Sequence, residues 1–168
     1  MTVIGEPVSE AMARMRGAAA MDLGRLAASA RIKSSAAAGG LPLVDLAPVR
    51  VLIVEDEALI AMNLESLIED FGFEVCAVAA RGAEAVTFAK ALHPDVVLMD
   101  VNLIGDMDGI EAARRIRETI DARIIFVTAY GTGEVLERIH TAVPDAPILS
   151  KPVAGSTLLD AITRTEPR

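Results

Sequence analysis

Residues 49–57 read Val-Arg-Val-Leu-Ile-Val-Glu-Asp-Glu, an apolar and mostly β-branched run that ends in three acidic residues. Such a run is typical of a strand buried on both faces, as in a parallel sheet covered by helices. Residues 95–102 repeat the pattern, because four apolar residues are followed by Asp100 and, two positions later, by Asn102. The two stretches predict a parallel sheet whose strands end in polar side chains.

Five strands of this kind alternate with segments of helical periodicity. The predicted strands cover residues 49–54, 73–79, 95–99, 123–127 and 146–149, and the predicted helices cover residues 60–71, 82–92, 109–116, 132–140 and 156–163. Asp108 is a predicted N-cap, because Glu111 follows it at the spacing of a capping box. Right-handed crossovers favour an α/β fold, a flavodoxin-like, doubly wound five-stranded parallel sheet of order 2-1-3-4-5.

The first 48 residues differ in composition from the rest of the chain. Residues 1–48 contain 12 alanines and carry a net charge of +1, whereas residues 49–168, the predicted domain, carry −9. Residues 9–32 have the periodicity of a helix, and the Ser, Ala and Gly run at 34–40 is typical of a linker. We therefore expect an Ala-rich N-terminal extension that is flexible or partly helical; a helix that docks on a partner is the alternative.

The composition argues against several classes of function. A net charge of −8 without clustered Lys and Arg argues against nucleic acid as a partner. The apolar runs are far shorter than the ~20 residues of a membrane span, and we find no signal peptide. The single cysteine, Cys76, cannot form an internal disulfide and fits a reducing cytoplasm.

Functional groups follow four of the five predicted strands. They are Glu55 and Asp56 after the first, Asp100 and Asn102 after the third, Thr128 at the end of the fourth, and Lys151 after the fifth. The carboxyl ends of parallel strands share one edge of the sheet, so these groups are expected to meet there. Converging carboxylates repel one another, and a divalent cation relieves the repulsion; oxygen ligands without His or Cys favour Mg²⁺. Because Mg²⁺ commonly binds phosphate oxygens as well, Asp100 is a candidate nucleophile toward phosphorus, with Lys151 and Thr128 as ligands of the phosphoryl oxygens.

On these residues, the segment 49–165 resembles the receiver domain of bacterial response regulators, the partners of sensor histidine kinases. The resemblance implies that Asp100 is the phosphoacceptor. It also implies that Mg²⁺ is bound by Glu55, Asp56, Asp100 and the backbone carbonyl of Asn102.

The resemblance extends to the groups that bind the phosphate. It implies that Thr128 is the switch hydroxyl and that the Ala129 backbone lies beside it. Lys151 matches the lysine of the family, which usually precedes its proline, here Pro152, through a cis peptide bond.

Three features depart from the commonest receiver pattern. Ile148 stands where most receivers carry an aromatic residue, and the loop 101–109 is one residue longer than usual and lacks the common proline. Residues 126–131 resemble a receiver subgroup with a Phe-Ala-Thr-Gly-aromatic signature, so we expect Tyr130 to take part in signalling in place of the missing ring. The chain also ends a few residues after the last predicted helix, which predicts output through a protein contact or onward phosphotransfer.

The predicted function is therefore that of a single-domain, cytoplasmic response regulator and not of an enzyme. Its expected partners are a sensor histidine kinase or His phosphotransfer protein and an unknown downstream protein, and a homodimer is left open. One alternative is a receiver-shaped interaction module that is never phosphorylated. Another is a Mg²⁺-dependent phosphatase with an aspartate nucleophile, which is disfavoured because Asn102 stands where such enzymes carry a second aspartate. A flavodoxin is excluded because residues 55–57 would repel a phosphate.

Overall fold

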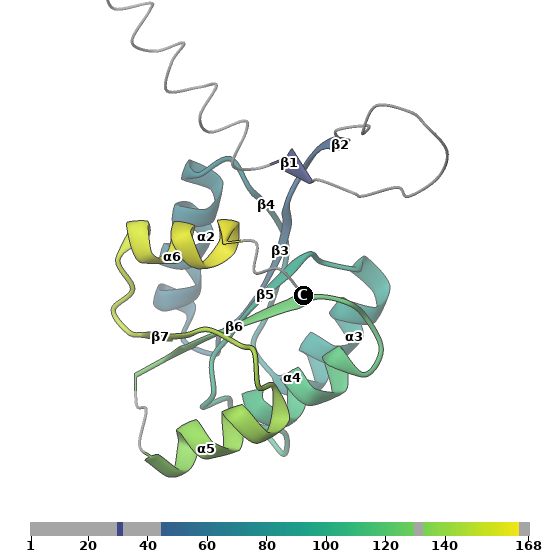
Figure 1. Ribbon diagram of the computed structural model, residues 1–168, viewed down its shortest axis with the longest axis vertical. Coiled ribbons are helices and arrows are strands. Elements are labelled where there is room, and N and C mark those ends of the chain that lie inside the picture. Colours follow the sequence, from purple (N-terminus) through teal and green to yellow (C-terminus); the bar gives the residue numbers. More distant parts are fainter. Residues whose placement is uncertain (1–29, 32–44, 130–132, 165–168) are drawn as a thin grey trace, which may run out of the picture.

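The computed structural model describes residues 30–31, 45–129 and 133–164 (Figure 1). The strands are β1 (Ala30–Arg31), β2 (Asp45–Pro48), β3 (Arg50–Val54), β4 (Glu74–Ala79), β5 (Val96–Met99), β6 (Arg123–Thr128) and β7 (Ile148–Ser150). The helices are α2 (Ala58–Asp70), α3 (Gly82–Leu92), α4 (Gly109–Arg117), α5 (Gly133–Ala142) and α6 (Gly155–Thr163). None of these helices combines the length and the apolar character that crossing a membrane requires.

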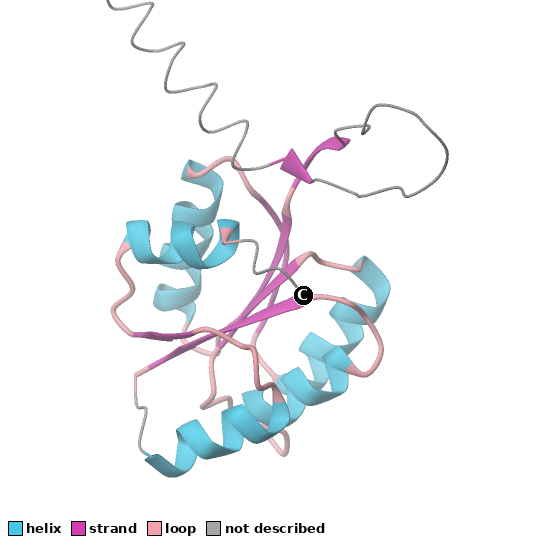
Figure 2. Ribbon diagram, in the orientation of Figure 1, coloured by secondary structure: helices cyan, strands magenta, loops and turns pink. Residues whose placement is uncertain are grey.

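Strands β3 to β7 form one parallel sheet with the spatial order β4-β3-β5-β6-β7 (Figure 2). For the five predicted strands this is the order 2-1-3-4-5, so the predicted fold class is confirmed. The order places β3 beside β5, with Val54 opposite Met99. The residues that follow these two strands therefore start from adjacent positions at the same edge of the sheet.

Helices cover both faces of the sheet, as the apolar character of its central strands requires. On one face, α2 and α6 contribute Leu64, Ile68 and Leu158 to a buried cluster with the strands. On the other face, α3, α4 and α5 pack against the alternate strand residues, among them Leu52 and Phe126 (Figure 1). With both faces covered, the ends of the strands are where the sheet can present polar side chains.

The observed bounds of the five strands and five helices differ from the predicted bounds by no more than two residues. The largest difference in a strand is at β7, which starts at Ile148 and not at residue 146. Pro147 has no N–H to donate to a neighbouring strand, although its carbonyl accepts a hydrogen bond of 2.9 Å from the Phe126 N–H. The pairing with β6 therefore becomes regular only after the proline.

The N-terminal segment departs from the prediction where it is described. Residues 30–31 belong to the predicted helix 9–32, but they form β1 and pair antiparallel with β2. The helix prediction is therefore wrong at its C-terminal end. Strand β2 precedes β3 by a single residue and offers β1 an edge with which to pair. Residues 1–29 and 32–44 lie outside the described residues, and the domain boundary at residue 48 stays a prediction.

Candidate functional site

Three carboxylates meet where β3 and β5 end. Glu55 and Asp56 follow β3 directly, and Asp100 follows β5. One carboxylate oxygen from each of these residues lies within 4.8 Å of the other two. The side chains of Glu55 and Asp100 are only 1% and 7% exposed, whereas Asp56 is partly exposed. The structure thus brings together the three predicted acidic residues and buries two of them.

Lys151, which follows β7, places its ammonium group between two of these carboxylates. Its Nζ lies 2.6 Å from Glu55 Oε2 and donates a hydrogen bond of 2.7 Å to Asp100 Oδ2. The lysine side chain is 11% exposed, so both ion pairs are largely shielded from water. The Lys151 N–H also donates to the Thr128 carbonyl at 2.9 Å, which joins the ends of β6 and β7. The ammonium therefore offsets negative charge that would be costly to bury alone.

The pKa values of these groups reflect their burial and their pairing. Burial raises the pKa of Glu55, and the hydrogen bond and positive charge of Lys151 offset only part of the rise. Burial acts to lower the pKa of Lys151, but its hydrogen bonds to Asp100 and Glu55, together with the negative charges of these two carboxylates, outweigh burial and raise the pKa above its usual value. Lys151 therefore carries a positive charge beside Asp100 at neutral pH.

The backbone around Asp100 is held from two sides. The Asp100 N–H donates to the Val54 carbonyl at 2.9 Å, and the Asn102 N–H donates to Asp100 Oδ1 at 3.3 Å. Gly109 packs so closely that a Cβ atom there would lie 1.8 Å from the Asp100 carbonyl oxygen. The chain that leaves Asp100 thus returns to it at the start of α4, and only a glycine fits at the point of return.

The loop between Asp100 and α4 is anchored by apolar side chains. Val101 and Leu103 are buried in the cluster beneath α3, α4 and α5. The tip of the loop is exposed at Ile104 and Gly105, and Gly105 has a φ of 123°, which favours glycine. The loop is therefore held by Val101 and Leu103, and its tip projects into solvent.

The predicted phosphate-binding groups lie at the ends of β6 and β7. Thr128 is buried as the last residue of β6 and pairs in register with Ser150. Ala129 follows it and is exposed. The peptide bond between Lys151 and Pro152 is cis. These positions adjoin the strand ends that carry the acidic cluster.

Two further positions, Asn102 and Ile148, stand apart from the buried cluster. The Asn102 side chain is exposed, so its predicted role rests on its backbone carbonyl. Ile148 is half-buried as the first residue of β7 and packs against the apolar cluster beneath α3, α4 and α5. Tyr130 lies outside the described residues, and its part in signalling stays a prediction.

The donor set fits Mg²⁺. The group formed by Glu55, Asp56 and Asp100 offers three carboxylate oxygens and includes no His or Cys. Mg²⁺ prefers oxygen ligands and is usually bound through one or two carboxylates together with water and phosphate. These three side chains would hold the ion, and Lys151 adds a positive charge on the other side of Asp100.

Sequence reasoning missed one polar contact near this site. Asp108 accepts a hydrogen bond of 2.9 Å from the Glu111 N–H, as its predicted N-cap role requires, and also forms an ion pair with Arg138 of α5. The spacing of Asp108 and Glu111 indicated the cap. No local pattern indicated Arg138, because its position beside Asp108 depends on how α5 packs on α4.

A separate hollow lies elsewhere in the described part of the chain. It has a volume of about 640 Å³ and lies between α6 and the loop that precedes β7, with Arg117, Arg123 and Arg164 among its lining residues. Arg123 is the first residue of β6, so the hollow lies at the opposite end of the strands from Asp100. None of the predicted site residues that the structure describes lines it.

Comparison with known proteins places the chain in a family. Residues 51–163 match the model of the response regulator receiver domain. The chain is 42% identical over 115 residues to the transcriptional regulatory protein PdtaR of Mycobacterium tuberculosis, a match that covers 68% of this chain and 55% of that protein. It is 37% identical over 118 residues to the chemotaxis protein CheY of Bacillus subtilis, covering 69% of this chain and 96% of that one. The chain thus matches about half the length of PdtaR and nearly all of CheY.

Solved structures agree with this result. The signal receiver domain of a modulated diguanylate cyclase from Desulfovibrio desulfuricans G20 is 38% identical and superposes with a TM-score of 0.64 over 67% of this chain and 89% of that chain. The CheX-CheY-BeF3-Mg+2 complex from Borrelia burgdorferi gives 28% identity and a TM-score of 0.63 over 69% of this chain and 87% of that one. The chain therefore belongs to the family of response regulator receiver domains, the signalling switches of two-component systems.

Proposed function

We propose that this chain is a single-domain, cytoplasmic response regulator in which Asp100 accepts a phosphoryl group from a histidine of a sensor kinase or His phosphotransfer protein. The observation that carries the proposal is the position of the Asp100 carboxylate. It lies at the end of a central strand, within 4.8 Å of two other carboxylates and 2.7 Å from the Lys151 ammonium.

Each site residue has a separate role in phosphoryl transfer. An Asp100 carboxylate oxygen forms a bond to phosphorus while the bond from phosphorus to the donor histidine nitrogen breaks. Lys151 neutralises phosphoryl oxygens, and the Thr128 hydroxyl and the Ala129 N–H donate hydrogen bonds to them. Mg²⁺, when bound by Glu55, Asp56, Asp100 and the Asn102 carbonyl, neutralises charge shared by the carboxylates and the phosphoryl group.

The output follows from the same contacts. Phosphorylation draws Thr128 and Lys151 toward the phosphoryl oxygens, and the face formed by α5, β7 and α6 changes its affinity for a downstream protein. The phosphoryl group shifts this equilibrium only by as much as it is bound better in one state than in the other. Because Ile148 cannot supply the usual aromatic ring, we assign Tyr130 to this switch.

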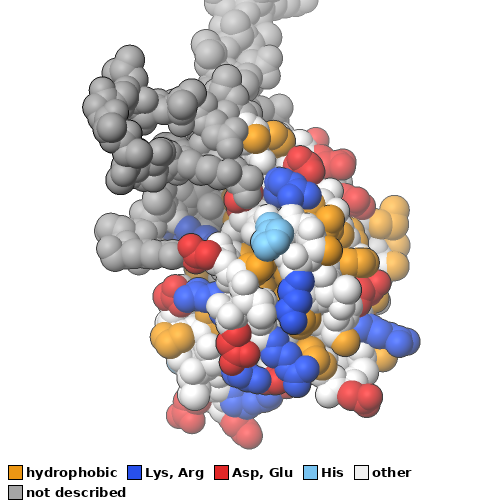
Figure 3. All heavy atoms as spheres, turned by 90° about the vertical axis from the view of Figure 1, so that its right-hand side faces the viewer, with side chains coloured by type: hydrophobic (Ala, Val, Ile, Leu, Met, Phe, Trp, Pro, Cys, Tyr) orange, Lys and Arg blue, Asp and Glu red, His pale blue; other side chains and the backbone are white. Residues whose placement is uncertain are grey.

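The charges on the face that carries α3 and α4 argue against nucleic acid as a partner of that face. On the face that carries α3 and α4, Lys and Arg side chains lie beside Asp and Glu side chains (Figure 3). Nucleic-acid binding requires basic side chains gathered in a stripe or patch, which a face of mixed charge does not provide. A complex of a CheY relative with CheX, BeF3 and Mg+2 is a precedent for a protein partner.

Mass spectrometry tests the proposal. The protein is incubated with Mg²⁺ and a small acyl phosphate, and the added phosphoryl mass is measured on the wild type, on Asp100→Asn and on Asp106→Asn. Asp106 is an exposed aspartate of the loop after Asp100 and serves as the matched control. We expect the adduct on the wild type and on Asp106→Asn, and its loss from Asp100→Asn or after chelation of Mg²⁺.

The other outcomes separate the alternatives. Absence of an adduct on the wild type would overturn the proposal and favour an interaction module that is never phosphorylated. Continuous release of phosphate from many phosphomonoesters would favour the phosphatase.

A further inference from the structure

Helix α5 is attached to the rest of the domain by few buried side chains. Ile139 is its one fully buried residue, and Val135 and Ala142 are half-buried against the same apolar cluster. Leu136 is also half-buried, and the other residues of the helix are exposed. With so little apolar attachment, charge pairs have more influence on how α5 lies against α4 than they would on a well-buried helix.

Two Arg–Asp pairs flank the region where α4 and α5 pack together. Arg138 of α5 pairs with Asp108 at the N-terminus of α4. At the other end, Arg117 of α4 pairs with Asp145, just beyond α5, with 3.2 Å between Nη1 and Oδ2. The two pairs have the same chemistry, although Asp145 is 65% exposed and Asp108 only 36%, and only the first pair lies next to the loop that follows Asp100.

Asp108 is in turn connected to the backbone of Asp100. Its carboxylate caps α4 through the Glu111 N–H, and the next residue, Gly109, donates its N–H to the Val101 carbonyl at 3.0 Å. Gly109 also packs against the Asp100 carbonyl oxygen with no room for a Cβ atom. A displacement of the backbone at Asp100 or Val101 therefore cannot be absorbed without moving the start of α4.

We propose that Arg138 is a positioning residue that couples α5 to the loop after the phosphoacceptor through its ion pair with Asp108. The inference rests on the proposed function, because it assigns a route by which phosphorylation of Asp100 reaches the output face. Ile148 supports this proposal, because an aliphatic side chain at that position cannot transmit a change at Asp100 to the output face by the rotation of an aromatic ring.

The expected size of the coupling is modest. The Arg138 and Asp108 side chains are 50% and 36% exposed, and exposed ion pairs typically change an equilibrium about 1.5- to 5-fold. An effect in this range is sufficient to bias a switch whose two states are close in free energy. The closeness of Arg138 and Asp108 does not by itself show coupling, so an experiment must measure how a change at Asp100 affects α5.

Hydrogen exchange of the α5 amides, with and without beryllofluoride and Mg²⁺ as a phosphoryl analogue, tests the coupling. In the wild type we expect the analogue to change the exchange rates of residues 133–142. In Arg138→Gln this change should shrink about 1.5- to 5-fold. Asp108→Asn should behave in the same way, because asparagine still caps the helix but cannot form the ion pair.

Two controls separate coupling from a general loss of stability. Arg117→Gln breaks the matched pair and should leave the response of α5 to the analogue unchanged, and Arg138→Lys should restore most of the response. A structural effect alone would change exchange equally with and without the analogue. An unchanged response in Arg138→Gln, or an equal loss in Arg117→Gln, would overturn the inference while leaving the proposed function intact. If the wild type itself fails to bind the analogue, both the inference and the proposed function fall.

Discussion

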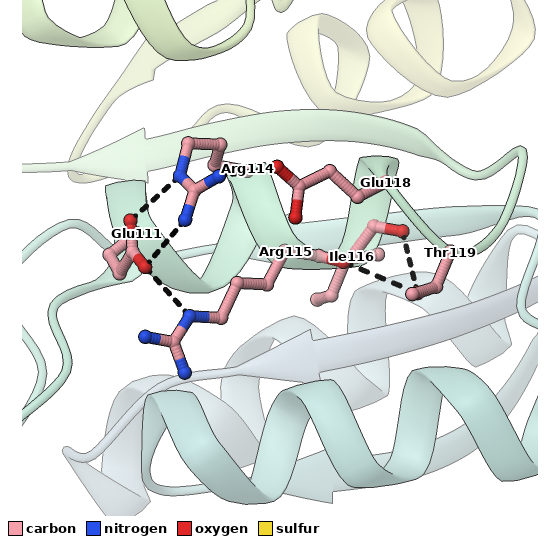
Figure 4. Close-up of polar contacts among 6 residues, drawn as sticks. All are labelled: Glu111, Arg114, Arg115, Ile116, Glu118 and Thr119. Carbon is pink, nitrogen blue, oxygen red and sulfur yellow. Dashed lines mark hydrogen bonds and ion pairs between the residues drawn. The ribbon is translucent and has the colours of Figure 1, made fainter.

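The protein uses the same kinds of charged side chain in two opposite environments. At the carboxyl edge of the sheet, Glu55, Asp100 and Lys151 are between 1% and 11% exposed. On α4, Glu111 accepts hydrogen bonds from Arg114 and Arg115 at the partly exposed surface of the helix (Figure 4), and Arg114 also pairs with Glu118. The side chains of Glu111, Arg114 and Glu118 are 36%, 44% and 58% exposed.

The two glutamates show what the difference in environment does. Burial raises the pKa of Glu55, although Lys151 lies beside it. Hydrogen bonds from Arg114 and then from Arg115 lower the pKa of Glu111 to about 2. The α4 network lies in water and costs little to maintain, whereas the buried cluster is costly and is characteristic of a functional site.

Removal of the Lys151 ammonium group should have the largest effect and is the strongest test of this contrast. Without Mg²⁺, Lys151→Met should lower the free energy of unfolding by about 3 kcal/mol, because two carboxylates stay buried without their partner. Arg114→Met, the matched change on α4, should leave the stability nearly unchanged. Urea unfolding at neutral pH in the presence of a chelator measures the free energy of unfolding of both variants. Added Mg²⁺ should reduce the difference in this free energy between Lys151→Met and the wild type. Equal losses in the two variants would remove the contrast.

A change in the packing of Gly109 against Asp100 should have the next largest effect on stability. Gly109→Ala would place a Cβ atom 1.8 Å from the Asp100 carbonyl oxygen, and no rotation of a side chain can relieve that contact. We expect a loss of about 2 kcal/mol, as for other overpacked sites. Gly133→Ala is the control, because no atom of the described residues lies within 4 Å of a Cβ atom there. The control should change stability by no more than about 1 kcal/mol, measured by thermal unfolding. A tolerated Gly109→Ala would show that the loop yields more easily than its contacts indicate.

The smallest expected effect on stability comes from the ion pairs of Glu111 on α4. The folded-state pKa of Glu111 lies at about 2, below its ordinary value of 4.5. A depressed carboxyl pKa contributes stability above the unfolded pKa, and this contribution is lost as the pH falls toward the folded value. The difference in stability between the wild type and Glu111→Gln should therefore be constant above about pH 5 and shrink from there toward pH 2. Added salt should also reduce this difference in stability. A difference that changes with neither pH nor salt concentration would contradict this account.

The sequence predicted most of the fold because the relevant signals are local. The apolar run ending at Val54 and the one ending at Met99 define central strands, whichever helices cover them. The spacing of Asp108 and Glu111 likewise defined the start of α4. Prediction failed at residues 30–31, where a composition that suits a helix was overridden by pairing with β2.

The site was predictable in outline and not in detail. The sequence by itself determined which residues follow the strands, and therefore that Glu55, Asp56, Asp100 and Lys151 share one edge of the sheet. Only the tertiary structure decided that Lys151 lies between two buried carboxylates and that Arg138 pairs with Asp108. The reason is distance along the chain: these pairs are separated by 51 and 30 residues, and their geometry depends on how whole helices and strands pack. Local patterns determine the secondary structure elements, whereas packing between distant elements determines burial, and burial determines the electrostatics of the site.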